Sequence, residues 1–371
     1  MMESLGRQTC PSVVNPAEGR KIELIGSFPP PTAIWRISKM TLRSLAGSAN
    51  LSIIRNTSLP YGTLGGTGIP LYGFSALPTS AAPILNYGFP RLAFPELVAR
   101  VSAARDAGSV VHFLSEDLWP WIRFGSVAVT IHGNPLATIA TDRYYTFSIA
   151  HRLATSRNLR CFSRVARALV HSEYVKQGLR DFGYSGPIDV IPPAVDPLFH
   201  PRQDRSEIRR KLGLPSDKIL LLSISTAEKR KNLQVLPKIA DALPLQFALV
   251  RVGPPVRGAI TLSGLSDEAV ADLYSACDAL LFPTLEEGFG LPVIEAFASG
   301  LPVVASDIPP FREIASGAAL LVDPTSPAVN TQACLDAIGM RDELRVKGLQ
   351  RAEGYSLDHL RSRLLSFYSS F

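Results

Sequence analysis

The sequence predicts an α/β fold with two domains, each a parallel sheet covered on both faces by helices. Short apolar runs alternate with amphipathic segments along most of the chain, which is the pattern of repeated strand–helix–strand units. The chain has 371 residues, of which 46% are hydrophobic. A chain of that size can bury more than one core, so two domains are the expected arrangement.

The carboxyl half shows the pattern most clearly. Between its second and third expected strands, Ser266 and Asp267 can cap a helix whose apolar positions form a single stripe. Because parallel strands end at the same edge of a sheet, these units predict a ligand crevice at that edge. The expected strands of this half are 219–224, 247–252, 279–282, 302–305 and 319–322.

The amino half predicts a second sheet with less regular spacing. A stretch rich in glycine and proline, residues 60–95, interrupts it and is expected to hold loops. Its segment 62–68 lacks the glycine spacing and the lysine of phosphate-binding loops, so a flexible loop is the favoured interpretation. The expected strands are 22–25, 51–54, 110–113, 127–131 and 168–170.

A proline-rich connector separates the two halves. Residues 191–201 contain four prolines in eleven positions, which is typical of a stiff linker between domains. We therefore predict a first domain over residues 1–195 and a second over residues 196–355.

Charge is unevenly distributed between the halves. Residues 1–195 carry 19 basic and 11 acidic side chains, whereas the rest of the chain carries 19 and 21. A solvated helix face is the favoured interpretation of the basic excess, and a contact with lipid phosphates on a membrane surface is the alternative. Nucleic acid is not expected as a partner. Part of the excess recurs at helical spacing, at Arg157, Arg160, Arg164 and Arg167.

Nothing in the sequence predicts export or a membrane span. The first 20 residues are polar and are broken by Pro11 and Pro16. No apolar run reaches the roughly 18 residues that a spanning helix needs. The four cysteines lack paired spacing, which suits reduced thiols better than disulfides or a zinc site. We expect a cytoplasmic protein, with peripheral contact at the inner face of the membrane as the alternative.

The segment 282–296 carries the most chemical information. An expected strand ends near Phe282, a loop with glycines follows, and Pro292 suits the first position of a helix. Backbone amides at such a helix start form an anion site, and Gly288 and Gly290 let the backbone approach the anion closely. A diphosphate fits such a site.

Two glutamates accompany this loop. Glu287 lies on the loop and Glu295 is expected in the first helical turn, so their carboxylates can accept hydrogen bonds from different hydroxyls of one extended sugar ligand. The segment 229–232, Lys-Arg-Lys-Asn, is expected at the start of another helix on the same edge, where its cations can neutralise a diphosphate. No aspartate pair of metal-binding type lies on this edge, and we expect neither a metal nor another cofactor.

These residues resemble the signature of the family 4 glycosyltransferases. Glu287 and Glu295 have seven residues between them, including Gly-Phe-Gly-Leu-Pro, as in the EX7E motif of that family. The segments 230–232, 191–201 and 318–324 are similar to its Arg-Lys-Asn segment, its interdomain connector and its closing strand. The resemblance implies the GT-B architecture, in which two Rossmann-like doubly wound domains face each other across a cleft. It also implies a carboxyl-terminal helix, about 356–371, that packs back on the first domain.

The amino half resembles the family at fewer positions. Residues 130–133, Thr-Ile-His-Gly, are similar to the segment whose histidine faces the donor sugar, which implies that His132 stabilises the sugar during transfer. On residues alone, a histidine after a strand is more often structural. Two features depart from the family: the loop 26–33 lacks its Gly-Gly pair, and the arginine that often precedes the lysine is replaced near Thr226.

The resemblance implies a retaining hexosyltransferase, in which the acceptor attacks the face that the diphosphate leaves. The first domain would bind the acceptor and the second the nucleotide diphosphate sugar. Glu287 would orient the sugar hydroxyls, Lys231 would stabilise the departing diphosphate, and Glu295 would hold the ribose. With His132, Glu287 and Lys231 as catalytic residues, the expected substrate-binding residues are Arg230, Gly288, Phe289, Gly290, Leu291 and Glu295.

The expected substrates are a mannose-like hexose and a glycan or lipid-linked acceptor, in the synthesis of cell-surface polysaccharide or glycoconjugates. The basic amino half and the aromatic segment 119–124 favour such an acceptor. The alternative is a subunit that binds a nucleotide sugar without catalysis, which the missing Gly-Gly pair motivates. A nicotinamide oxidoreductase is disfavoured because no GxGxxG follows the first expected strand.

Overall fold

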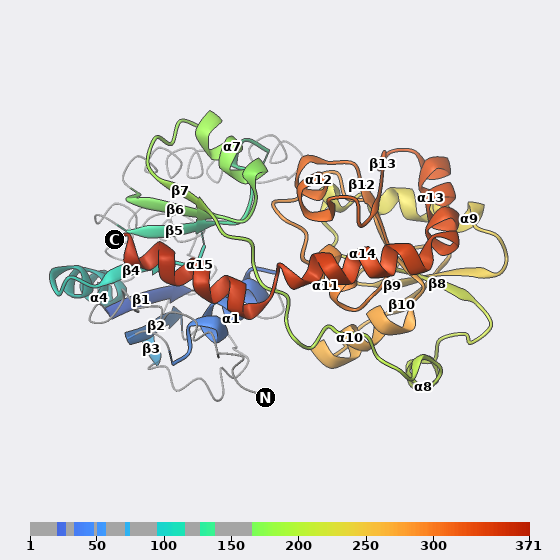
Figure 1. The fold of residues 1–371 in the computed structure, drawn as a ribbon, viewed down its shortest axis with the longest axis horizontal. Coiled ribbons are helices and arrows are strands. Elements are labelled where there is room, and N and C mark those ends of the chain that lie inside the picture. Colours follow the sequence, from blue (N-terminus) through green and yellow to red (C-terminus); the bar gives the residue numbers. More distant parts are fainter. Residues whose placement is uncertain are drawn as a thin grey trace, which may run out of the picture.

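The computed structural model describes residues 21–26, 33–47, 50–56, 71–74, 95–115, 127–137 and 165–371. These residues form two lobes that stand side by side, each built on one sheet (Figure 1). Neighbouring strands pair in parallel throughout both sheets. The predicted class, two doubly wound α/β domains, is confirmed.

The first sheet has seven strands in the described residues, in the order β3-β2-β1-β4-β5-β6-β7. Because the order reverses between β1 and β4, the crevice of this sheet is expected at that point. The strands are β1 (Lys21–Gly26), β2 (Asn50–Asn56), β3 (Leu71–Phe74), β4 (Val110–Phe113), β5 (Ala128–Ile131), β6 (Arg167–Val170) and β7 (Ile188–Val190).

Two expectations for the amino half are wrong. The stretch 60–95 does not hold loops alone, since β3 lies within it and pairs with the end of β2. A four-residue run gives too short a pattern to be recognised, and the pairing with β2 makes it a strand. Arg167 lies in β6 rather than on a helix, where its guanidinium donates to the carboxylate of Asp189 at 2.5 and 2.9 Å. Arg157, Arg160 and Arg164 lie outside the described residues.

The second sheet has the order β10-β9-β8-β11-β12-β13. Each strand that the sequence predicts in this half is present. The edge strand β10 was missed because its side chains are only half-buried and give a weak apolar signal. The strands are β8 (Ile219–Ile224), β9 (Phe247–Val252), β10 (Ala259–Leu262), β11 (Ala279–Phe282), β12 (Val303–Ser306) and β13 (Leu320–Val322).

Helices cover both sheets. The predicted cap of α10 is confirmed, since the Ser266 hydroxyl accepts from the amide of Ala269 at 3.2 Å. The helices are α1 (Ala33–Leu45), α4 (Pro95–Asp106), α7 (Glu173–Asp181), α8 (Arg205–Lys211), α9 (Leu236–Ala242), α10 (Asp267–Ala276), α11 (Leu291–Ala298), α12 (Pro309–Ala315), α13 (Pro327–Gly339), α14 (Arg341–Glu353) and α15 (Leu357–Ser369). None of those in the described ranges is long and apolar enough to cross a bilayer.

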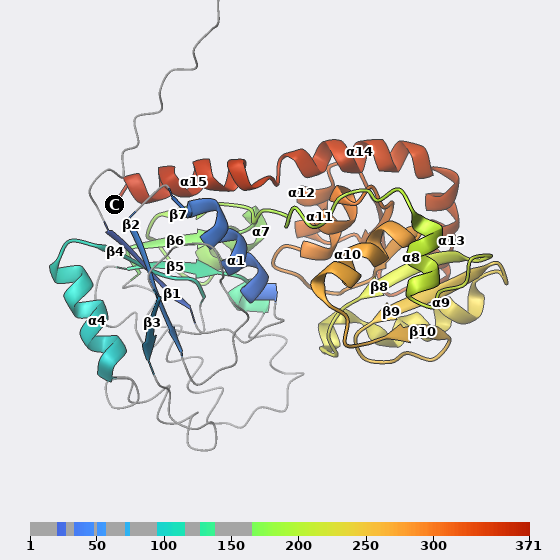
Figure 2. The same cartoon turned by 90° about the horizontal axis from the view of Figure 1, so that it is seen from below.

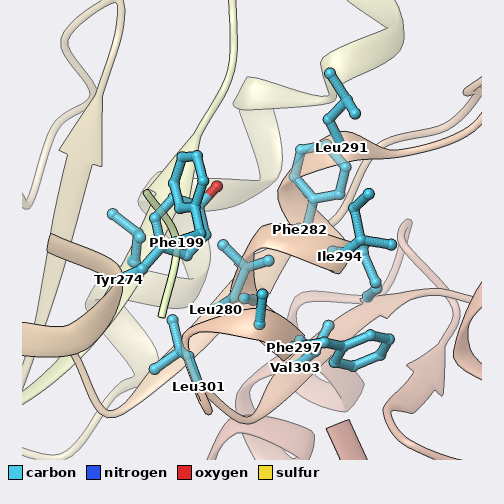
Figure 3. Packing of buried hydrophobic residues seen from close by; sticks show 14 of the residues in the cluster. Phe199, Tyr274, Leu280, Phe282, Leu291, Ile294, Phe297, Leu301 and Val303 are labelled. Carbon is cyan, nitrogen blue, oxygen red and sulfur yellow. The ribbon is translucent and has the colours of Figure 1, made fainter. Parts of the chain in front are cut away.

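Strand β11 shows how the second sheet is buried on both faces. Leu280 and Phe282 belong to one hydrophobic cluster, and Leu281 belongs to the cluster on the opposite face. Figure 3 shows the first of these clusters, in which Ile294 and Phe297 of α11 pack near the strand side chains. Full burial on both faces explains why central strands read as continuous apolar runs.

The last two helices join the lobes along one side (Figure 2). Helix α14 packs on α11 of the second domain, and α15 crosses to pack on α1. Leu364 and Phe367 of α15 lie in the core of the first domain. The two segments that pass between the domains are in contact. The amide of Val195, after β7, donates to the carbonyl of Tyr355, between α14 and α15, at 2.9 Å. The first core therefore contains residues from both ends of the described chain.

Candidate active site

The loop between β11 and α11, residues 283–290, is held against the turn that follows β8. The amide of Leu285 donates to the carbonyl of Arg230 at 2.7 Å. The side-chain amide of Asn232 donates to the carbonyls of Pro283 at 3.0 Å and Pro324 at 2.8 Å. Asn232 is 3% exposed, so these bonds satisfy a buried polar group. The two loops at the carboxyl edge of the second sheet therefore form one unit.

The turn after β8 brings two cations to Glu287. Residues Lys229–Lys231 form a 3-10 turn rather than the expected start of a helix. Asn232 interrupts it with a left-handed φ of 56°, a conformation that asparagine tolerates better than most residues. The guanidinium of Arg230 donates to Glu287 Oε2 at 2.9 Å, and the ammonium of Lys231 binds Oε1. The cations and Glu287 thus lie together at the carboxyl edge of the second sheet.

The cluster is shielded from water. Glu287 is 8% exposed. Burial alone would lower the pKa of Arg230, but the carboxylates of Glu287 and Glu228 outweigh it and raise the pKa. Burial raises the pKa of the neighbouring Glu286 more than Arg230 lowers it. Charges interact more strongly in such surroundings than in water, so these cations would attract an added anion strongly.

The two glycines of the loop have different tasks. A Cβ on Gly288 would lie 1.8 Å from the carbonyl oxygen of His132, so the glycine lets this loop approach the first domain. The Gly288 carbonyl also accepts from the Ser172 hydroxyl at 2.7 Å. Gly290 has a φ of 120° and starts α11, where a Cβ would lie 2.5 Å from the Phe311 ring. The group that lies close to Gly288 in the structure is thus the backbone of His132, whereas the sequence predicted an anion there.

Phe289 and Leu291 were expected to bind substrate. Both side chains lie in the main hydrophobic cluster of the second domain, with exposures of 5% and 8%. The Phe289 ring packs edge-on against Tyr355 at 5.8 Å between centroids. Leu291 also lines the small cavity beside Glu295, whereas Phe289 is packed within the core.

His132 comes to the same place from the first domain. It follows β5 directly, and its Nε2 lies 2.8 Å from the carbonyl of Leu114. Its Nδ1 lies 3.1 Å from Nε2 of His171, which follows the neighbouring strand β6. Burial lowers the pKa of His132 to about 4. The sequence analysis missed His171, although Ile131 and Val170 pair across β5 and β6 and thus place the following residues side by side.

Glu295 has partners of its own and does not share the cations that bind Glu287. It is the fifth residue of α11 rather than part of its first turn. Its carboxylate accepts from the Tyr274 hydroxyl at 2.9 Å and pairs with Arg36 of α1 at 2.5 Å. Burial raises the pKa of Glu295, against the effect of Arg36. Glu295 and Arg36 line a small cavity between the domains with Asp196 and other residues.

The second domain is similar in sequence to known proteins. Its residues 220–339 match the family described as Glycosyl transferases group 1. O-antigen chain mannosyltransferase B of Escherichia coli is 26% identical over 170 residues, 40% of this chain and 45% of that protein. MMP alpha-(1->4)-mannosyltransferase of Mycolicibacterium hassiacum is 34% identical over 160 residues, 38% of each chain. These alignments span less than half of the relatives.

The whole fold also has solved counterparts. HepE of Anabaena, solved in complex with UDP and glucose, superposes with a TM-score of 0.74. The superposition covers 95% of this chain and 100% of HepE at 16% identity, so it shows the fold alone. The predicted GT-B architecture is thereby confirmed.

Some expectations for the candidate site fall on residues outside the described ranges. The residues between Gly26 and Ala33, where the Gly-Gly pair is missing, lie outside the described ranges, as does the aromatic segment 119–124. Within the part of the chain that the structure describes, no group of three or more histidine, cysteine or acidic side chains could hold a metal ion.

Proposed function

We propose that this chain is a retaining hexosyltransferase that uses a nucleotide diphosphate sugar. The observation that carries the proposal is the partly buried group of Arg230, Lys231 and Glu287 beside the glycine loop that starts α11. The match of residues 220–339 to the group 1 glycosyltransferases supports it independently.

The proposed mechanism rests on neutralising the leaving group. As the bond from the sugar to the diphosphate breaks, the diphosphate gains charge and the sugar becomes an oxocarbenium-like cation. Lys231, Arg230 and the amides at the start of α11 stabilise the departing anion. Glu287 orients the sugar hydroxyls, and the acceptor hydroxyl attacks from the side that the diphosphate leaves. No metal is needed, because the two cations supply its charge.

Glu295 holds the ribose in this proposal, which requires a change in the observed contacts. Arg36 and Tyr274 now fill the hydrogen-bonding positions of its carboxylate. Donor binding would have to separate Arg36 from Glu295, and this separation would open the contact between α1 and α11. The first domain would then accept the acceptor substrate across the cleft.

The proposed donor carries a mannose-like hexose, and the proposed acceptor is a glycan or a lipid-linked glycan of a cell-surface polysaccharide or glycoconjugate. The names of the two mannosyltransferase relatives support this choice. The uridine nucleotide and glucose in the solved HepE complex support a nucleotide sugar as the donor class. Peripheral contact with the inner face of a membrane would bring the enzyme to a lipid-linked acceptor.

Replacement of Lys231 by alanine tests the proposal. Transfer from UDP- and GDP-hexoses would be followed by release of nucleotide, with NMR of the product to read the anomeric configuration. Lys231→Ala should lower kcat by about 10²–10³, the effect of removing one group that stabilises transition-state charge. Lys347→Ala, on the exposed face of α14, is the matched control.

Three results would reject parts of the proposal. Near-normal transfer by Lys231→Ala would discard the assignment of Lys231. A product of inverted configuration would discard retention. Nucleotide binding by the wild-type chain without transfer to any acceptor or to water would favour the alternative, a subunit that binds nucleotide sugars without catalysis.

A further inference from the structure

Two buried imidazoles lie in series between two backbone carbonyls of the first domain. His132 Nε2 lies 2.8 Å from the carbonyl of Leu114, and His171 Nδ1 lies 2.9 Å from the carbonyl of Ile191. Between them, His132 Nδ1 and His171 Nε2 are 3.1 Å apart. A carbonyl oxygen only accepts, so the outer nitrogen of each ring must carry a proton to form its bond.

The proton count of this arrangement is informative. Two neutral imidazoles carry two protons, and the two carbonyls use both of them. The facing nitrogens then present two lone pairs to each other. A third proton between His132 Nδ1 and His171 Nε2 would complete all three hydrogen bonds and would give the pair one positive charge.

The protein without ligand holds the pair neutral at pH 7. Burial lowers the pKa of His132 to about 4 and that of His171 to about 3. The titratable group that faces the pair from β4 is His112, whose own pKa burial lowers to about 3. Across the interface, the carboxylate of Glu287 is already bound by Arg230 and Lys231.

The pair touches the loop where the diphosphate is proposed to bind. The carbonyl of His132 lies against Gly288, and Ser172, next to His171, donates to the Gly288 carbonyl at 2.7 Å. The rings of His171 and Phe289 are 6.5 Å apart between centroids. An anion at the start of α11 would therefore lie close to both imidazoles.

We propose that His132 and His171 form one proton-binding unit, which takes a proton from solvent when the diphosphate of the donor binds beside Gly288. His171 is a positioning residue, because it holds the shared proton against His132 and orients that ring toward the sugar. This inference rests on the proposed function of the site.

The physical basis is the charge of the ligand. An opposite charge within about 4–6 Å raises the pKa of a basic group by about 1–3, and a diphosphate carries more than one charge. Such a rise moves the titration of the pair toward neutral pH. Because the bound state then holds more protons than the free state, nucleotide binding strengthens as pH falls through the pKa of the bound state.

The direct test is nitrogen NMR of the histidine rings. The wild-type chain, labelled in its imidazoles and assigned by single substitutions, would be titrated with and without UDP or GDP. We expect the free protein to show His132 protonated on Nε2 and His171 on Nδ1. With nucleotide bound, one titration should move upward from about 4 by at least one pH unit.

Calorimetry in buffers of different ionisation enthalpy measures the same proton independently. We expect wild type to take up a fraction of a proton on binding UDP or GDP at pH 6. His171→Gln keeps a neutral donor toward His132 Nδ1 and should abolish the uptake, so that the ratio of wild-type to variant affinity grows as pH falls, by up to about tenfold per pH unit. This ratio cancels the protonation of the nucleotide itself.

His200→Gln is the control, because His200 is exposed on the second domain and its ring lies 3.2 Å from the Pro201 carbonyl, far in sequence from the histidine pair. It should leave the uptake unchanged. Nucleotide binding without proton uptake, or with the opposite ring tautomers, overturns this inference and leaves the proposed function intact. Absence of nucleotide binding to wild type overturns both. A pH profile of His171→Gln that matches wild type would show that His171 serves the fold alone.

Discussion

Glu287 and Glu295 belong to one motif, yet their surroundings differ in origin. Glu287 is bound by Arg230 and Lys231, which lie on a neighbouring loop of the same domain. Glu295 is bound by Arg36, which comes from α1 of the other domain. The first contact survives any motion between the lobes, whereas the second exists only while they are closed. Membership of one sequence motif therefore does not give the two carboxylates the same role.

Among the variants of the two glutamates and their partners, Glu287→Gln should have the largest effect. The amide keeps the size of the side chain but removes the charge that both cations bind, so that Arg230 keeps only its pair with Glu228. We expect kcat for sugar transfer to fall by about 10²–10³ with a smaller change in donor affinity. Glu343→Gln, on the exposed face of α14, is the control. A turnover within threefold of wild type would remove Glu287 from the catalytic residues.

Gly288→Ala tests the contact between the domains from the other side. A Cβ would meet the backbone carbonyl of His132 at 1.8 Å, so the loop or the whole lobe must move. We expect a loss of about 1–3 kcal/mol in stability and a larger radius of gyration in small-angle scattering. Gly339→Ala, where no atom lies within 4 Å, should keep both properties. An unchanged scattering curve would show that closure does not depend on this approach.

Much of this arrangement could be predicted from residue patterns. Continuous apolar runs identified every central strand of the second sheet, because strands buried on both faces have no polar side. The grouping of Lys231 with Glu287 followed from the shared carboxyl edge of parallel strands. Strands β3, β7 and β10 were missed, since short edge strands are defined by pairing rather than by pattern. Arg36 was missed because an ion pair between domains depends on how the two lobes pack.

Arg36→Met tests whether Arg36 competes with the nucleotide for Glu295. If Arg36 occupies the place that ribose takes on Glu295, its removal should raise the affinity for UDP or GDP by about fivefold or more. Arg36→Lys, which keeps the charge, should raise it less. The double variant with Glu295→Gln tests whether the two effects are coupled. Weaker nucleotide binding in Arg36→Met would mean that Arg36 assists the ligand instead.

The raised pKa of Glu295 predicts a pH dependence of stability. Its carboxyl binds a proton more readily in the folded than in the unfolded chain. Folding therefore becomes less favourable as pH rises from the ordinary glutamate pKa, about 4.3, through the raised folded value. Glu295→Gln should abolish this decline. Thermal unfolding of both proteins between pH 4 and 7 measures it, and parallel curves would contradict the assignment.

Tyr274→Phe tests the second partner of Glu295. It removes the hydroxyl that donates to Glu295 at 2.9 Å and keeps the ring, which packs edge-on against Phe199 at 5.3 Å between centroids. We expect a loss of about 1–2 kcal/mol in the free energy of unfolding, because the acceptor is charged. A loss above about 3 kcal/mol would show that the hydroxyl supports more than this one bond.

The return of α15 to the first lobe has a consequence for biosynthesis. His112, at the centre of the first sheet, shares a hydrogen bond of 2.6 Å with the Tyr368 hydroxyl, and Leu364 and Phe367 fill the core around it. The core of the first lobe is thus incomplete until the second lobe and α15 have been synthesised. Nascent chains should carry an uncovered apolar face for most of translation, which makes this lobe a natural client for chaperones.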